Sequence, residues 1–144
     1  MSEMPDNYNW IKMADHDLAT AIVVFERLPL QHETIAFHCQ QAVEKYIKFV
    51  LAANGIEFLR SHDLNYLLEL YDEKTPVTND YFEKTNNLKG FAVEIRYPDT
   101  IVNLTKEQLI DTIDIAFFFR QWAGELFSLP VNNQLYQLWQ QEKK

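Results

Sequence analysis

Apolar residues recur every three to four positions through most of the chain, the spacing that places them on one face of an α-helix. The first such run predicts a helix from about residue 7 to 28, bounded by Pro29, because proline cannot continue a helix. The second predicts a helix from about 32 to 54, which ends at Asn54-Gly55, a pair suited to a left-handed helix end. Only three Gly and five Pro interrupt the pattern. The fold class that it indicates is all-α.

Shorter periodic runs follow in the second half of the chain. Ser61 can cap a third helix, and a fourth is expected from about 78 to 91. Thr105 and Gln108 have the spacing of a capping box, in which each residue satisfies a backbone N–H of the other. This box predicts the start of a long last helix that reaches about Ser128.

We expect these helices to form an antiparallel up-and-down four-helix bundle with additional short helices. The bundle would occupy residues 1–130 as one domain, since 144 residues provide enough apolar content for a single core. The remaining tail, 131–144, keeps helical spacing at Leu135, Leu138 and Trp139. It is therefore expected to form either a short docked helix or a frayed end.

The last long helix carries more apolar surface than one side of a bundle needs. The residues that widen its apolar arc are Ile110, Phe118, Phe119 and Trp122. One explanation is a well-filled core with some half-exposed rings, and the other is a core plus a symmetric dimer interface. We favour the second explanation and expect a homodimer.

The composition of the chain limits the cellular location and the binding partners that we expect. The net charge of −8 argues against broad affinity for nucleic acid, because phosphate binding depends on clustered Lys and Arg, so any contact with RNA must be local. No stretch approaches the ~20 apolar residues of a membrane span, and the N-terminus lacks the pattern of a secretory signal. The single cysteine, Cys39, lies in an apolar helical stripe and is expected to be a buried hydrophobe. We expect a cytoplasmic protein without membrane contact.

Candidate chemistry from spacing alone is sparse. The four histidines do not show the spacing that prepares a metal site, and no Gly-rich phosphate loop is present. We therefore expect no metal and no cofactor. Asp15 and Asp17 flank His16, but neighbours on a helix point in different directions, so we interpret them as solvated.

Three short motifs are more specific. Residues 37–45 read FHCQQAVEK, residues 62–64 read HDL, and residues 96–99 read RYPD. In combination, FHxQQAxEK, HDL and RYPD resemble the HEPN domain family of small helical domains. The resemblance covers the chain from about Asn7 to Phe127 and implies a helical bundle, often paired as a dimer.

The resemblance also sets expectations about activity. HEPN ribonucleases carry an Arg followed after four to six residues by a His, before the last long helix, and cleave RNA without metal. Arg96 occupies the matching place, but no histidine follows it, so the general acid or base is missing. The chain is similar instead to a subgroup with the Arg-Tyr-Pro-Asp motif. Its members often stand beside a minimal nucleotidyltransferase in a two-component, toxin–antitoxin-like system, and nucleotide binding has been proposed for the fold. We therefore expect no catalytic residues.

The motif residues give a set of candidate ligand contacts: Arg96, Tyr97, Asp99, Lys45, His62 and His38. Arg96 could clamp a phosphate, or hold a neighbouring carboxylate in a structural ion pair. Tyr97 could stack on a base or anchor its loop. His62 is placed to hydrogen-bond to the second helix, and His38 could join a buried polar network that fixes helix register.

Two rival functions remain open. An active ribonuclease would need Arg96 to converge in the fold with another base, such as His62 or His38. A protein-interaction subunit would use the acidic surface to bind a basic partner, and its binding would weaken at high salt.

Overall fold

The computed structural model describes residues 4–89 and 103–144, with side chains from Asn7 onward. These residues form six α-helices and no strand. Their bounds are α1 Met4–Arg27, α2 His32–Ala53, α3 Leu64–Lys74, α4 Asn79–Asn87, α5 Lys106–Phe127 and α6 Asn133–Glu142. The all-α prediction is confirmed, and the first two helices and the last long helix begin and end within a few residues of their expected bounds.

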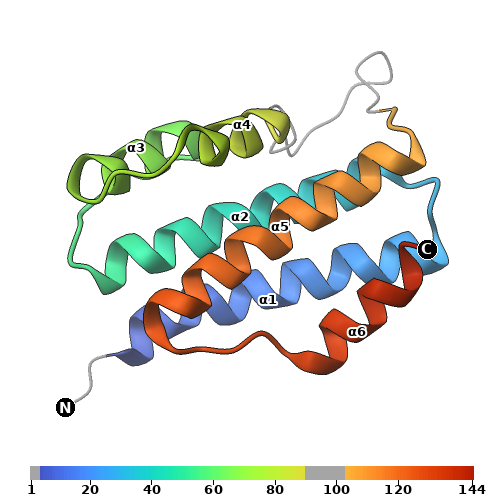
Figure 1. Cartoon of the computed structure of the whole chain (residues 1–144), viewed down its shortest axis with the longest axis horizontal. Coiled ribbons are helices and arrows are strands. Elements are labelled where there is room, and N and C mark those ends of the chain that lie inside the picture. The colour runs from blue at the N-terminus through green and yellow to red at the C-terminus, as the bar shows by residue number, and fades with distance from the viewer. Residues whose placement is uncertain (1–3, 90–102) are drawn as a thin grey trace.

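The helices follow one another up and down the bundle (Figure 1). α1 and α2 run antiparallel, α5 lies against both, and the consecutive helices α3 and α4 together supply the third pass. α6 lies beside α1, at the edge opposite α3 and α4 (Figure 1). The architecture is therefore the expected four-helix bundle, with one pass broken into two short helices and one helix added at the end.

Local capping explains where α5 and α3 begin. The backbone N–H of Gln108 donates to the Thr105 hydroxyl at 3.1 Å, and the N–H of Thr105 donates to the Gln108 side chain at 2.9 Å, which confirms the capping box. The cap of α3 is Asp63, whose carboxylate accepts from the N–H groups of Asn65 and Tyr66, and not Ser61. The Ser61 hydroxyl instead accepts from the N–H of Asp63 at 3.0 Å, so it supports the cap from outside the helix. The expected fourth helix ends earlier than predicted, at Asn87.

The wide apolar arc of α5 is covered from within the chain. Edge-to-face ring pairs join it to three other helices: Tyr71 to Trp122 at 5.2 Å, Tyr81 to Phe118 at 4.9 Å, and Tyr136 to Phe117 at 5.6 Å between centroids. α3, α4 and α6 thus each place a tyrosine on α5. This packing favours a filled core as the reason for the arc, and the homodimer stays a prediction.

The tail forms a docked helix. Trp139 of α6 is fully buried, its ring lies 5.2 Å from that of Phe25, and its indole N–H donates to Asp114 at 2.8 Å. Asn132 caps the helix by accepting from the N–H of Leu135. The frayed alternative is therefore wrong.

Two expectations from composition concern burial and hydropathy. Cys39 is fully buried on α2, as expected, and burial raises the pKa of its thiol well above the ordinary range. Among the described residues, no helix has the length and apolar content needed to cross a membrane.

Candidate functional site: a polar network between three elements

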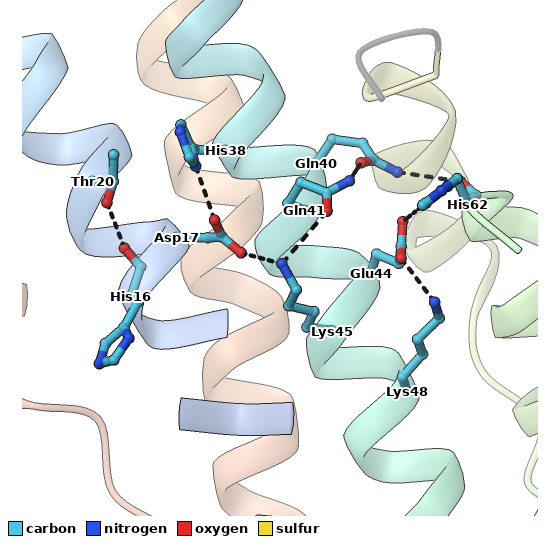
Figure 2. A network of polar contacts seen from close by, with 10 residues as sticks. All are labelled: His16, Asp17, Thr20, His38, Gln40, Gln41, Glu44, Lys45, Lys48 and His62. Atoms are coloured by element: carbon cyan, nitrogen blue, oxygen red, sulfur yellow. Dashed lines mark hydrogen bonds and ion pairs between the residues drawn. The ribbon is translucent and has the colours of Figure 1, made fainter. Parts of the chain in front are cut away.

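The candidate ligand residues fall into two groups. His38 and Lys45 lie on α2, and His62 lies just before α3. Arg96, Tyr97 and Asp99 lie outside the described residues. The first group and its partners form a continuous polar network, shown in Figure 2.

Asp17 of α1 is the centre of the first part of the network. His38 Nδ1 lies 2.9 Å from Asp17 Oδ1, and Lys45 Nζ donates to Oδ2 at 2.6 Å. Lys45 also donates to Gln41 Oε1 at 3.4 Å. His38, Gln41 and Lys45 are three or four residues apart, so they share one face of α2, from which His38 and Lys45 reach α1. Both carboxylate oxygens of Asp17 are thereby engaged.

The electrostatics of Asp17 follow from these contacts. Its side chain is 15% exposed, and burial alone would raise the pKa of the carboxyl. Hydrogen bonds from His38 and Lys45, together with their positive charge, outweigh burial and lower the pKa below its ordinary value. Asp17 is therefore held as a carboxylate that ties α1 to α2.

Glu44 is the centre of the second part. Its Oε1 lies 2.9 Å from His62 Nδ1, and its Oε2 accepts from Lys48 Nζ at 2.8 Å. Glu44 is 3% exposed and Lys48 6%, so this ion pair is buried. The ammonium of Lys48 also lies 5.4 Å from the ring centre of Trp10 and 5.9 Å from that of Phe58. Aromatic faces thus replace part of the water that Lys48 loses.

A pair of glutamines links the two parts. Gln41 Nε2 donates to Gln40 Oε1 at 2.9 Å, and Gln40 Nε2 donates to the carbonyl oxygen of His62 at 3.2 Å (Figure 2). The polar residues of the FHxQQAxEK motif therefore bind α1 on one side of α2 and the start of α3 on the other side. The predicted contact of His62 with the second helix is confirmed, as is the predicted polar network through His38.

The interpretation of Asp15 and Asp17 as solvated is wrong. Asp17 binds two bases of α2, while Asp15 Oδ1 accepts from Tyr46 Oη at 2.6 Å and from Arg120 Nε at 2.9 Å. The two residues point in different directions, as expected, but α1 is packed against both α2 and α5, so each direction leads to a partner. Burial raises the pKa of Tyr46 well above its ordinary value, and the charge of Asp15 adds to this effect. The one signal in the sequence was the position of Arg120 within the apolar face of the last helix.

One imidazole of the network reaches solvent. The side chain of His62 is 63% exposed, its contact with Glu44 uses Nδ1, and no hydrogen bond from the described residues reaches its Nε2. It borders a hollow of about 120 Å³ whose lining includes Gln40, Asn65, Thr85 and Lys89. This space suits one small polar group, such as a phosphate, and is below the ~300 Å³ of a typical ligand pocket.

Metal ligation is not supported by the geometry of the described part of the chain. No group of three His, Cys, Asp or Glu side chains within it is arranged to hold an ion. Charges in the network are balanced instead between carboxylates and bases: Asp17 with His38 and Lys45, and Glu44 with His62 and Lys48.

Comparisons with known proteins agree with this architecture. The chain is similar to the crystal structure of TT1696 from Thermus thermophilus, with a TM-score of 0.71 and 23% identity over 83% of this chain and 96% of that one. It is also similar to ST0689, described as an archaeal HEPN homologue, with a TM-score of 0.66 and 26% identity over the same shares. No curated protein matches the chain. The family model of the HEPN domain matches residues 8–126, which include α1 to α5 almost entirely, and the chain therefore belongs to the HEPN domain family.

Proposed function

We propose that this HEPN-domain chain is a non-catalytic module that associates with a nucleotide or RNA and works beside a minimal nucleotidyltransferase in a two-component, toxin–antitoxin-like system. The partner is suggested by the resemblance of the FHxQQAxEK, HDL and RYPD motifs to that subgroup of the family. The non-catalytic character is suggested by the missing histidine after Arg96.

The internal pairing of the motif side chains is the observation that carries the proposal. Asp17 and Glu44 each bind two bases, and Glu44 and Lys48 are buried. Carboxylates and ammonium groups engaged in this way fix the relative positions of α1, α2 and α3 and are not available to move protons for a substrate. They make a rigid support on which a ligand contact can be presented.

The exposed contact on this support is His62. His62 and Lys89 border the same small hollow, and an imidazole and an ammonium group can both donate to a phosphate oxygen. Arg96 follows Lys89 in the chain, and we propose that it joins them in binding the phosphate of a nucleotide or of RNA. The net charge of −8 limits such binding to this local site.

Co-purification from the native host tests the partner and the ligand together. The tagged protein is isolated, bound proteins are identified by mass spectrometry, and released nucleotide or RNA is analysed by chromatography. A stoichiometric nucleotidyltransferase and a bound nucleotide are expected. His62→Ala should lose the nucleotide, while His16→Ala, a change at an exposed histidine of α1 that makes no side-chain contact in the network, should retain it. Isolation of a clean homodimer without partner or ligand would refute the proposal.

A specific observation keeps the ribonuclease as a second candidate. An exposed imidazole oriented through Nδ1 by a buried carboxylate, as His62 is by Glu44, is the arrangement that aligns a histidine base in many enzymes. This candidate predicts RNA cleavage in the presence of a chelator that is lost in both His62→Ala and Arg96→Ala. Cleavage that survives both changes would exclude it.

The third candidate, a protein-interaction subunit, is distinguished by the effect of salt concentration on partner binding. If the acidic surface alone binds a basic partner, the partner should dissociate as ionic strength rises, and no nucleotide should be released from the purified complex.

A further inference from the structure

A cavity of about 670 Å³ lies between α1, α5 and α6. Its size falls within the ~300–1,000 Å³ of small-molecule sites. It is separate from the polar network around His62, since its lining contains none of the residues of the hollow near Lys89. α6 begins after residue 126, where the match to the family model ends, so this cavity depends on a helix outside the matched domain. Figure 1 shows α6 beside α1, and these two helices supply most of the lining residues of the cavity.

The walls of the cavity are mainly apolar, with an amide rim. Leu18, Ala19, Val131, Leu135 and Leu138 supply the apolar surface. Gln134, Gln137 and Gln141 recur on α6 at intervals of three and four residues and supply side-chain amides. Such a lining suits a ligand with a short apolar body and one polar end.

The polar end is defined by Asp15. Its Oδ1 accepts from both Tyr46 Oη and Arg120 Nε, while no residue in the described chain donates to its Oδ2. The side chain is 37% exposed and lines the cavity. An ionised carboxylate accepts hydrogen bonds on both oxygens, so the unused capacity in this cavity is an acceptor.

Arg120 is less available to a ligand. It is 6% exposed, and besides Asp15 its guanidinium donates to the carbonyl oxygens of Leu129 at 2.9 Å and Pro130 at 3.0 Å. An anionic ligand would therefore meet a carboxylate that repels it, and a buried cation in which each of the three nitrogens already donates one hydrogen bond. A cationic donor would instead be attracted by the Asp15 carboxylate and could hydrogen-bond to its Oδ2.

We propose that this cavity binds a small primary amine with a short aliphatic chain. The ammonium group donates to Asp15 Oδ2 and to the amide oxygens of the α6 glutamines, and the chain lies on Leu18 and Leu138. An ammonium has three donors and no acceptor, which matches Asp15 Oδ2 and the side-chain amide oxygens that the α6 glutamines bring to the lining.

Calorimetric titration of the full chain with three probes tests the proposal. n-Hexylamine, 1-hexanol and hexanoate share an aliphatic chain and differ in the polar end. Hexylamine is expected to bind at least about 10-fold more tightly than the other two, which corresponds to one charge-assisted hydrogen bond. Equal binding of hexanoate, or no detectable binding of hexylamine, would overturn the proposal.

Two variants locate the binding. Asp15→Asn keeps a carbonyl oxygen for Tyr46 and Arg120 but removes the charge at Oδ2, so hexylamine should bind about 10-fold more weakly while hexanol is unchanged. Ala19→Leu leaves the ion pair intact and fills part of the cavity, so it should weaken all binding even if the first variant folds poorly. Glu69→Ala, a change at an exposed position of α3 outside the cavity lining, should bind hexylamine as the wild type does. Wild-type affinity in Ala19→Leu, or in a folded Asp15→Asn, would contradict the assignment.

Discussion

Removing the charge of Glu44 is the sharpest test of the network. The substitution Glu44→Gln keeps the shape of the side chain and one acceptor oxygen for His62 Nδ1 or Lys48 Nζ. It removes the carboxylate that both bases contact at 2.8–2.9 Å. The change therefore isolates the role of the charge from that of the packing.

The expected loss follows from burial. The Glu44 and Lys48 side chains are 4% and 8% exposed, so the variant leaves an ammonium in the interior without its counter-charge. Breaking one partner of a buried ion pair typically costs about 3–5 kcal/mol. Because the amide still accepts one hydrogen bond and Trp10 and Phe58 face the ammonium, we expect the lower end, about 3 kcal/mol.

The double variant Glu44→Gln, Lys48→Met separates this explanation from a simple loss of contacts. Methionine is apolar and flexible, and it would lie where Lys48 lies now, against Trp10 and Phe58. Replacing a buried pair by uncharged groups is often near neutral, so the double variant should lie within about 1 kcal/mol of the wild type. Glu26→Gln is the matched control, because its pair with Arg27 lies at the surface, with side chains 29% and 77% exposed, and should contribute less than about 1 kcal/mol.

The assay is urea unfolding followed by far-ultraviolet circular dichroism, with the free energy of unfolding extrapolated to water. The reasoning is refuted if Glu44→Gln unfolds with a free energy within about 1 kcal/mol of the wild type. It is also refuted if the double variant is as unstable as the single one, since the cost would then come from Glu44 itself and not from an unpaired Lys48.

Two more predictions concern the end of α5 and the response to acid. Gly124→Ala should destabilise the protein by about 2 kcal/mol, despite the better helix propensity of alanine, because the added Cβ would lie 2.3 Å from the carbonyl oxygen of Leu129. Gly55→Ala meets nothing within 4 Å and should cost only the strain of a positive φ, about 1 kcal/mol, so equal losses in urea unfolding would contradict this account. Asp17 has its pKa lowered by folding, so its stabilisation is fully present above the ordinary value of 3.8 and is lost as pH falls through the lower folded value. The wild type should therefore lose stability in acid more steeply than Asp17→Asn, and parallel stability curves from about pH 6 to pH 2 would show this to be wrong.

The helices could be predicted because their signals are local. Apolar spacing marked α1 and α2 within a few residues, and the Thr105 and Gln108 box placed the start of α5. The sequence predicted Ser61 as the cap of α3, whereas the structure has Asp63, and this difference has a local cause too. Both side chains offer an oxygen, and which one caps depends on where the chain turns into the helix.

The candidate site was predicted in part. The predicted contact of His62 with α2 is correct. The polar residues around His38 also indicated a network, because a dense run of polar side chains in an otherwise apolar helix needs hydrogen-bond partners. Its main acceptor on α1, Asp17, was missed. The contacts of Asp17 join residues 21 and 28 positions apart, and that of Asp15 with Arg120 spans 105 positions.

The sequence by itself determined the main helices, the capping box of α5 and the family motifs, because each depends on residues within a turn or two of one another. Only the tertiary structure decided which charges meet, how the aromatic arc of α5 is covered, and that α6 borders an open cavity together with α1 and α5. The physical reason is that these features depend on the rotation and register of whole helices. Rotation and register are fixed by the packing of the entire core and not by any local run of residues.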